Sequence, residues 1–160
     1  MGSRPTIAVR AYIAGFLDGD GSLMLQLKQR RDSTNGWRFM ATMCFYQDSA
    51  HAAPLSWIRK QLGIGYVTNR NDRISELRIN GNAQVDVILE YLLPFLRFKR
   101  AQAIAMRRAL RILRRTTSGK MTKQEKVHVL LYIQQIQNNN YRAVHRRSIQ
   151  QLKRIVGLTP

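Results

Sequence analysis

The apolar positions near the start of the chain change their spacing once, from a helical period to strict alternation. From about Ile7 to Leu17 they recur at helical spacing, and Thr6 is the expected N-cap residue. The two glycines of the segment 18–21 then end the helix. From Leu23 to Leu27 the alternate residues are leucines, which predicts a half-buried strand.

A second alternating run follows a turn cluster that ends in Asn35-Gly36. Its apolar face is formed by Trp37, Phe39, Ala41, Met43 and Phe45. Its opposite face is formed by Arg38, Met40, Thr42 and Cys44. Two alternating runs joined by such a turn predict a β-hairpin.

The same order of elements then recurs. Pro54 and Gly63 bound a short helix, and a second hairpin is expected over 65–80 with its turn at Asn71-Asp72. A helix with Val85, Ile88, Leu89 and Leu92 at core spacing follows, up to Pro94. The order αββαββα predicts an α+β fold with a four-stranded antiparallel sheet.

After Phe98 the chain becomes basic and helical. A helix over 101–115 carries Ile104, Leu110, Ile112 and Leu113. A second helix, over 123–137, opens with a Thr122/Glu125 capping box and places Val127, Leu130, Leu131 and Ile133 at core spacing. The last amphipathic segment runs over 142–156. We therefore expect one domain over 1–160, with a core over about 7–115 and a C-terminal helical extension over about 120–160.

The charge balance narrows the class of partner. Lys and Arg number 27 against 9 Asp and Glu, which gives a formal net charge of +18. Such an excess implies a polyanion, most often a nucleic acid, with an anionic membrane as the alternative. The apolar runs are too short to span a bilayer, and the start shows no secretory signal pattern. A lone cysteine, Cys44, excludes an internal disulfide, and the three histidines show no metal-ligand spacing.

Small residues and carboxylates coincide in the first helix. Ala11, Gly15 and Gly19 form a stripe at four-residue spacing, which allows another backbone to approach closely. The alternative is tight packing on the protein's own sheet. Asp18 and Asp20 at the end of this helix are poorly placed for its dipole but well placed to bind a hard cation. A solvated Asp-Gly turn is an equally good interpretation of this pattern alone.

These residues carry a family resemblance. The segment from Tyr12 to Ser22 reads YIAGFLDGDGS, which closely resembles the LAGLIDADG motif of homing endonucleases. The segments 63–67 (GIGYV) and 93–99 (LPFLRFK) resemble the single-motif members that are encoded in organellar introns. The resemblance covers most of residues 7 to about 115.

The resemblance implies a metal site and a dimer. The last acidic residue of the motif, Asp20, would bind Mg²⁺ together with the Gly19 carbonyl, while Asp18 matches a more structural position. A chain with one motif is expected to form a symmetric homodimer through its motif helix. The expected interface residues are Ala11, Ala14, Gly15 and Asp18.

Two further catalytic positions follow from the resemblance. Gln47 matches a polar residue that holds water near the scissile phosphate, and Lys99 matches a lysine that stabilises developing negative charge. The chain departs from a close relative's pattern at His51, where an arginine would be expected, so electrostatic support there would be weaker or pH-sensitive.

The polar faces of the two hairpins are the expected DNA-reading surface, because a two-stranded ribbon fits the major groove. The residues expected to face the bases are Gln26, Lys28, Arg30, Arg38, Thr68, Arg70, Glu76 and Arg78. The arginine pairs at 107–108, 114–115 and 146–147 are expected to touch phosphates. Binding should then weaken steeply with salt.

The expected function is therefore a magnesium-dependent, sequence-specific DNA endonuclease. Cleavage would leave a staggered double-strand break in a long pseudo-palindromic site and promote intron homing. The alternatives are an intron maturase that binds RNA, a DNA-binding regulator without nuclease activity, and a basic membrane-surface protein. The resemblance also implies an organellar gene, in a chloroplast or mitochondrion.

Overall fold

The computed structural model describes residues 4–29, 36–115, 120–140 and 147–158. The first part of the chain forms α1 (Ile7–Asp20), β1 (Gly21–Gln29), β2 (Trp37–Asp48), the 3₁₀ turn η1 (Ser49–His51), α2 (Ala53–Leu62), β3 (Tyr66–Asn69), β4 (Ile74–Asn80) and α3 (Asn82–Leu92). The rest forms α4 (Arg100–Arg115), α5 (Lys123–Asn139) and α6 (Ile149–Ile155). The predicted αββαββα order and the basic helices that follow it are confirmed.

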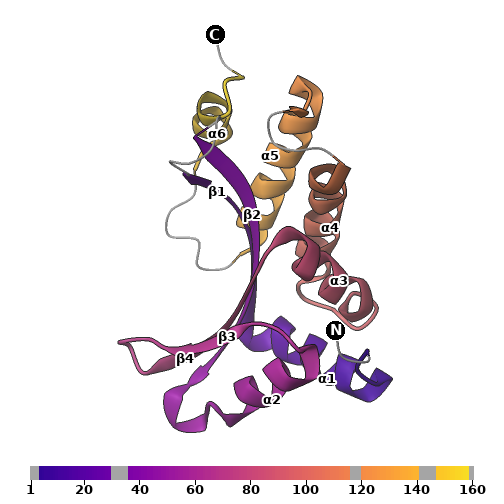
Figure 1. Ribbon diagram of the computed structural model, residues 1–160, viewed down its shortest axis with the longest axis vertical. Coiled ribbons are helices and arrows are strands. Elements are labelled where there is room, and N and C mark those ends of the chain that lie inside the picture. Colours follow the sequence, from indigo (N-terminus) through magenta and orange to yellow (C-terminus); the bar gives the residue numbers. More distant parts are fainter. Residues whose placement is uncertain (1–3, 30–35, 116–119, 141–146, 159–160) are drawn as a thin grey trace.

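The strands form one antiparallel sheet in the order β1-β2-β4-β3. Figure 1 shows a strongly twisted sheet, with β1 and β2 running upright and the β3–β4 hairpin extending to the left. Helices α1 to α5 pack on one face of the sheet (Figure 1), which we call the inner face, and α6 packs on α5. None of the described helices covers the opposite, outer face between β1 and β4, and both predicted hairpins contribute to it.

The first helix is longer than its pattern predicts. Thr6 is its N-cap residue, as expected, and accepts a hydrogen bond from the Val9 N–H. The helix continues past Leu17 to Asp20 and ends at Gly21, which has an extended backbone. The glycine at position 19 therefore does not end the helix, and the two aspartates belong to its last turn rather than to a separate turn.

Two glycines fix the connection between α2 and the second hairpin. Gly63 ends α2 with φ of 67°, and its N–H donates to the Arg59 carbonyl. Gly65 has φ of 98°, and a Cβ there would lie 2.9 Å from both Leu77 and Ile79. Only glycine allows the backbone to approach β4 this closely. The predicted turn at Asn71-Asp72 is also present.

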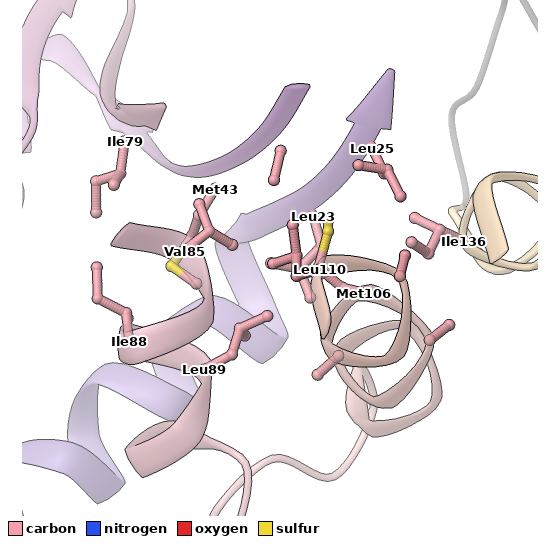
Figure 2. Close-up of a cluster of buried hydrophobic side chains, with 14 of the residues drawn as sticks. Leu23, Leu25, Met43, Ile79, Val85, Ile88, Leu89, Met106, Leu110 and Ile136 are labelled. Atoms are coloured by element: carbon pink, nitrogen blue, oxygen red, sulfur yellow. The ribbon is translucent and has the colours of Figure 1, made fainter. Parts of the chain in front are cut away.

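The core lies between the inner face of the sheet and the helices. Figure 2 shows Leu23, Leu25 and Met43 of the sheet meeting Leu89 of α3 and Leu110 of α4. The inward-facing residues predicted for the two long strands are all buried. Alternation along these strands was therefore a sound guide to the core.

The two long C-terminal helices bury only some of the residues that were predicted. In α4 Leu110 is buried as predicted, together with Ala103 and Met106, whereas Ile104 is only partly buried. In α5 Leu130 and Ile133 are buried as predicted, but Leu131 is 48% exposed, and Ile136, which was not among the predicted core positions, is buried. The reason is packing: α4 and α5 lie against each other, so the buried faces are those at their mutual contact.

The C-terminal end differs as well. The regular helix described within the predicted 142–156 segment is α6, which begins after its N-cap Ser148. None of the described helices is long and apolar enough to cross a bilayer.

Candidate active site and nucleic-acid interface

Asp18 ties the end of α1 to the segment that precedes α4. Its carboxylate accepts hydrogen bonds from the backbone N–H groups of Arg97, at 2.6 Å, and Lys99, at 2.8 Å. The side chain is only 9% exposed. A carboxylate beside the first turn of α4 satisfies backbone donors that the helix itself leaves unpaired. Asp18 is thus bound within its own chain.

Lys99 lies against the same helix end. Its amine donates to the Asp18 carbonyl at 2.6 Å, and the residue is 7% exposed. Burial lowers the pKa of Lys99 below the ordinary lysine value, while the charges of Asp18 and Asp20 oppose that shift. The charge of Asp20 thus acts on the Lys99 amine.

Asp20 and Gly19 are exposed at the C-terminal end of α1. The last carbonyl groups of a helix lack intrahelical partners, so the Gly19 carbonyl is available as an oxygen ligand. Within the described residues, no three Asp, Glu, His or Cys side chains come together as a metal site. The two aspartates of the motif therefore differ: one is a structural anchor and the other presents its carboxylate to solvent.

The small-residue stripe of α1 is open. Ala11, Gly15 and Gly19 are exposed, and a Cβ built on either glycine meets no atom within 4 Å. This excludes the alternative that the stripe packs on the protein's own sheet. The expectation that Ala14 and Asp18 share this surface is wrong, because both side chains are buried inside the chain.

Apolar side chains extend this surface toward the start of α1. Tyr12 is 53% exposed and meets Trp57 of α2 edge-on, with ring centroids 5.3 Å apart. Ala8, Val9 and Pro54 complete the lining of a shallow apolar hollow of about 440 Å³ around these rings. Trp57 could not be recognised from the sequence, because helical spacing alone does not separate an exposed aromatic from a core one.

Gln47 lies at the far end of β2, beyond the start of β1. Gly21 pairs with Phe45, so the residues after Phe45 lie at the sheet end where α1 terminates. The side-chain oxygen of Gln47 accepts a hydrogen bond from the Asp48 N–H at 2.9 Å. The fold thus brings Gln47 to the same end of the sheet as Asp20. His51 is exposed in η1 just beyond it.

The outer face of the first hairpin carries opposed cations. Lys28 pairs with Arg38 across β1 and β2, and both are exposed. Like charges directly opposite each other destabilise a sheet, so this pair favours an anion above it. Gln26, which faces Met40, extends the same surface. Arg30 lies outside the described residues.

The polar residues of the second hairpin differ in exposure and in pairing more than expected. Thr68 is exposed, and Arg70, just beyond β3, forms an ion pair of 2.8 Å with Asp72. Arg78 is half-buried, but Glu76 is only 4% exposed and is paired with Arg78. The expectation that Glu76 stands free to contact a base is wrong, because its carboxylate is bound within the sheet.

Some arginines of α4 also have partners in the chain. Arg107 and Arg114 both bind the carboxylate of Asp86 in α3, at 3.0 and 2.9 Å. The phosphate role expected of these two is therefore reduced, since each is already paired. Their neighbours Arg108 and Arg115 are exposed on the same helix.

Comparison with known proteins agrees with this geometry. The model of the LAGLIDADG endonuclease family matches residues 13–104. DNA endonuclease I-CvuI of Chlorella vulgaris is 38% identical over 93 residues, which are 58% of this chain and 58% of that protein. DNA endonuclease I-CreI of Chlamydomonas reinhardtii is 28% identical over 125 residues, 78% of this chain and 74% of that protein. The alignment with the Chlorella protein thus spans less than two thirds of its length.

The structural comparison extends over nearly the whole chain. A crystal structure of I-CvuI in complex with its target superposes with a TM-score of 0.82 at 25% identity, and the match covers 96% of this chain and 98% of that one. The chain thus has an α+β fold in which one helix, α1, carries the motif and ends in an exposed carboxylate. The chain belongs to the LAGLIDADG endonuclease family.

Proposed function

We propose that this protein is a magnesium-dependent, site-specific DNA endonuclease that acts as a homodimer. It cuts both strands of a long pseudo-palindromic duplex by phosphodiester hydrolysis, leaves a stagger, and so promotes intron homing. The observation that carries this proposal is the different state of the two aspartates at the end of α1. Asp18 is bound within the fold, whereas Asp20 is exposed beside the buried Lys99 amine.

The oxygen donors at this helix end suit a hard cation. The Asp20 carboxylate and the Gly19 carbonyl would hold Mg²⁺, which prefers oxygen ligands and retains several waters. Mg²⁺ held there would supply polarisation of the phosphate and activation of a water molecule. Crystal structures of the Chlorella relative were determined with DNA in the presence of magnesium or calcium, which supports a divalent cation here.

The protein's own groups have separate tasks. Lys99 is held by its bond to the Asp18 carbonyl, so its cationic end is fixed close to where Asp20 presents its carboxylate. We assign it the stabilisation of negative charge that develops on the phosphate. Gln47, at the same sheet end, would orient water through its amide group.

The open face of α1 is the proposed dimer surface. Ala11, Gly15 and Gly19 would allow two motif helices to approach closely, and Tyr12 with Trp57 would cover its margin. A two-fold axis along this face would place two Asp20 residues near each other, one for each DNA strand. A carboxylate from each protomer would also add to the ligands, because the described residues of one chain bring no three Asp, Glu, His or Cys side chains together.

DNA would lie along the outer face of the sheet. The opposed pair of Lys28 and Arg38 offers two cations side by side, and Arg78 and Thr68 continue the surface on the other hairpin. Binding of intron RNA and an organellar location for the gene remain predictions of the family resemblance.

The test is Asp20→Asn with the magnesium cleavage assay. The substitution removes the charge that would hold the cation and preserves the shape of the side chain, so we expect cleavage to be abolished. Binding of duplex DNA in Ca²⁺ should stay within about twofold. Glu90→Gln on α3 is the matched control: it removes an exposed carboxylate that lies outside the motif and should cut normally. Cutting by Asp20→Asn at the wild-type rate would refute the proposal.

A further inference from the structure

Glu76 occupies an unusual place for an acidic residue. It projects from the centre of the outer face, which none of the described helices covers, yet it is only 4% exposed. Its cross-strand partners are Tyr46 of β2 and Thr68 of β3. The next row of the same face contains Cys44, Arg78 and Tyr66. The neighbours of Glu76 thus remove it from solvent.

One oxygen of Glu76 has two donors inside the protein. Both the Nε–H of Arg78 and the thiol of Cys44, at 3.6 Å, donate to Oε1. Burial and the charge of Glu76 raise the pKa of Cys44 to about 12, so the thiol remains a neutral donor near pH 7. Burial likewise raises the pKa of Tyr46 to about 12, and its hydroxyl pairs with Ser22 at 3.0 Å. The cluster therefore holds one anion and one cation.

Arg78 has a different exposure from its partner. Its side chain is 31% exposed, whereas that of Glu76 is 5% exposed. A guanidinium carries donors on all three nitrogens, so the bond from Nε leaves its two terminal nitrogens for another ligand. Two parallel N–H donors match the O6 and N7 acceptors of guanine in the major groove. Glu76, by contrast, presents little of its carboxylate to a base.

We propose that Glu76 is a positioning residue that fixes the guanidinium of Arg78 to read a guanine. The carboxylate holds Nε and so fixes the plane of the guanidinium that carries the two terminal nitrogens. A side chain that is already fixed loses less conformational freedom on binding than a free arginine. This inference rests on the proposed function, because it requires DNA on the outer face.

Arg70 offers an internal comparison. It also pairs with a carboxylate, Asp72, but both side chains are about half exposed in the hairpin turn. An exposed pair of this kind is screened by water and fixes its arginine weakly. Removal of the Asp72 charge should therefore change base preference far less than removal of the Glu76 charge.

The experiment measures base preference at each position of the target. A preferred duplex is first selected from a randomised library by wild-type protein in Ca²⁺. Affinities are then measured for duplexes with every base pair replaced symmetrically in turn. Wild type, Arg78→Lys, Glu76→Gln, Glu76→Asp and Asp72→Asn are compared. Arg78→Lys keeps a cation beside the buried Glu76, so it loses the paired donors and leaves no unpaired buried charge.

We expect Arg78→Lys to abolish a guanine preference at one position of each half-site. Glu76→Gln should reduce the preference at that same position by about tenfold and leave the others unchanged, which a merely structural role would not do. Glu76→Asp should retain part of this guanine preference, and Asp72→Asn should retain all of it.

Three results would overturn the inference: full guanine preference in Glu76→Gln, an equal loss at every position, or a change at a position that Arg78→Lys leaves untouched. A wild-type protein that selects no duplex would instead overturn the proposed function, and this inference with it.

Discussion

At the scale of single residues, the motif contains two carboxylates in different environments: one is buried and hydrogen-bonded, and the other is exposed. Both follow from one stretch of sequence, and both were predicted to lie at a helix end. What the sequence could not reveal is that Arg97 and Lys99 donate backbone hydrogen bonds to Asp18, because these donors come from a distant part of the chain. For the same reason, the burial of Glu76 could not be derived from alternation, which assigns a face but no partner.

The difference between the aspartates predicts different effects on stability. Asp18→Asn replaces a carboxylate oxygen with an amide that would meet a backbone N–H, so at least one charge-assisted hydrogen bond is lost. Such bonds are worth about 1.5–3 kcal/mol each, and we expect the free energy of unfolding to fall by roughly 2–4 kcal/mol. Denaturant unfolding followed by circular dichroism measures this.

Asp20→Asn is the matched control for that measurement. Asp20 is exposed, so the same chemical change there should alter the free energy of unfolding by no more than about 0.5 kcal/mol. Equal stability of the two variants would contradict the structural role of Asp18.

At the scale of elements, strands followed their sequence pattern more closely than helices did. The alternating leucines of β1 and aromatic residues of β2 are buried as predicted, because a strand in a two-faced sheet has only two sides. The faces of α4 and α5 were partly wrong, since a helix between several neighbours can bury more than one stripe. Leu131, which is exposed, and Ile136, which is buried, are examples.

The open face of α1 carries a prediction for assembly. Gly15→Leu adds a side chain where nothing lies within 4 Å of the Cβ position, so the fold of one chain should accept it. The replacement of a helical glycine should even stabilise the helix, by roughly 1 kcal/mol. Two such helices could not approach closely, so the protein should sediment as a monomer and lose double-strand cleavage.

Ala83→Leu serves as the control for bulk. It places the same side chain on an exposed position in the first turn of α3, where the neighbouring Asn82 bonds Ala41 of β2, and should leave the sedimentation coefficient unchanged. A dimer of normal stability in Gly15→Leu would show that α1 does not form the interface.

At the scale of the whole molecule, the net charge indicates the kind of partner, and the fold indicates a surface for it. The net charge of +18 predicted a nucleic-acid partner but could not say which surface binds it. The surface that we propose for DNA is the outer face of the sheet, which no described helix covers and which carries opposed cations such as Lys28 and Arg38. Asp20 is an exposed acidic residue in a chain with a large excess of cations. A molecule that only bound DNA would gain nothing from an exposed acid at that place.

The measurement that tests this account most directly is cleavage of a randomised duplex library by the purified protein in Mg²⁺, with Ca²⁺ as the parallel control. The cut ends are then sequenced. We predict magnesium-dependent cuts at one long, roughly palindromic sequence, with the same short stagger on every molecule. Tight binding to duplex DNA without any cut in Mg²⁺ would contradict the account and leave a binding protein in its place.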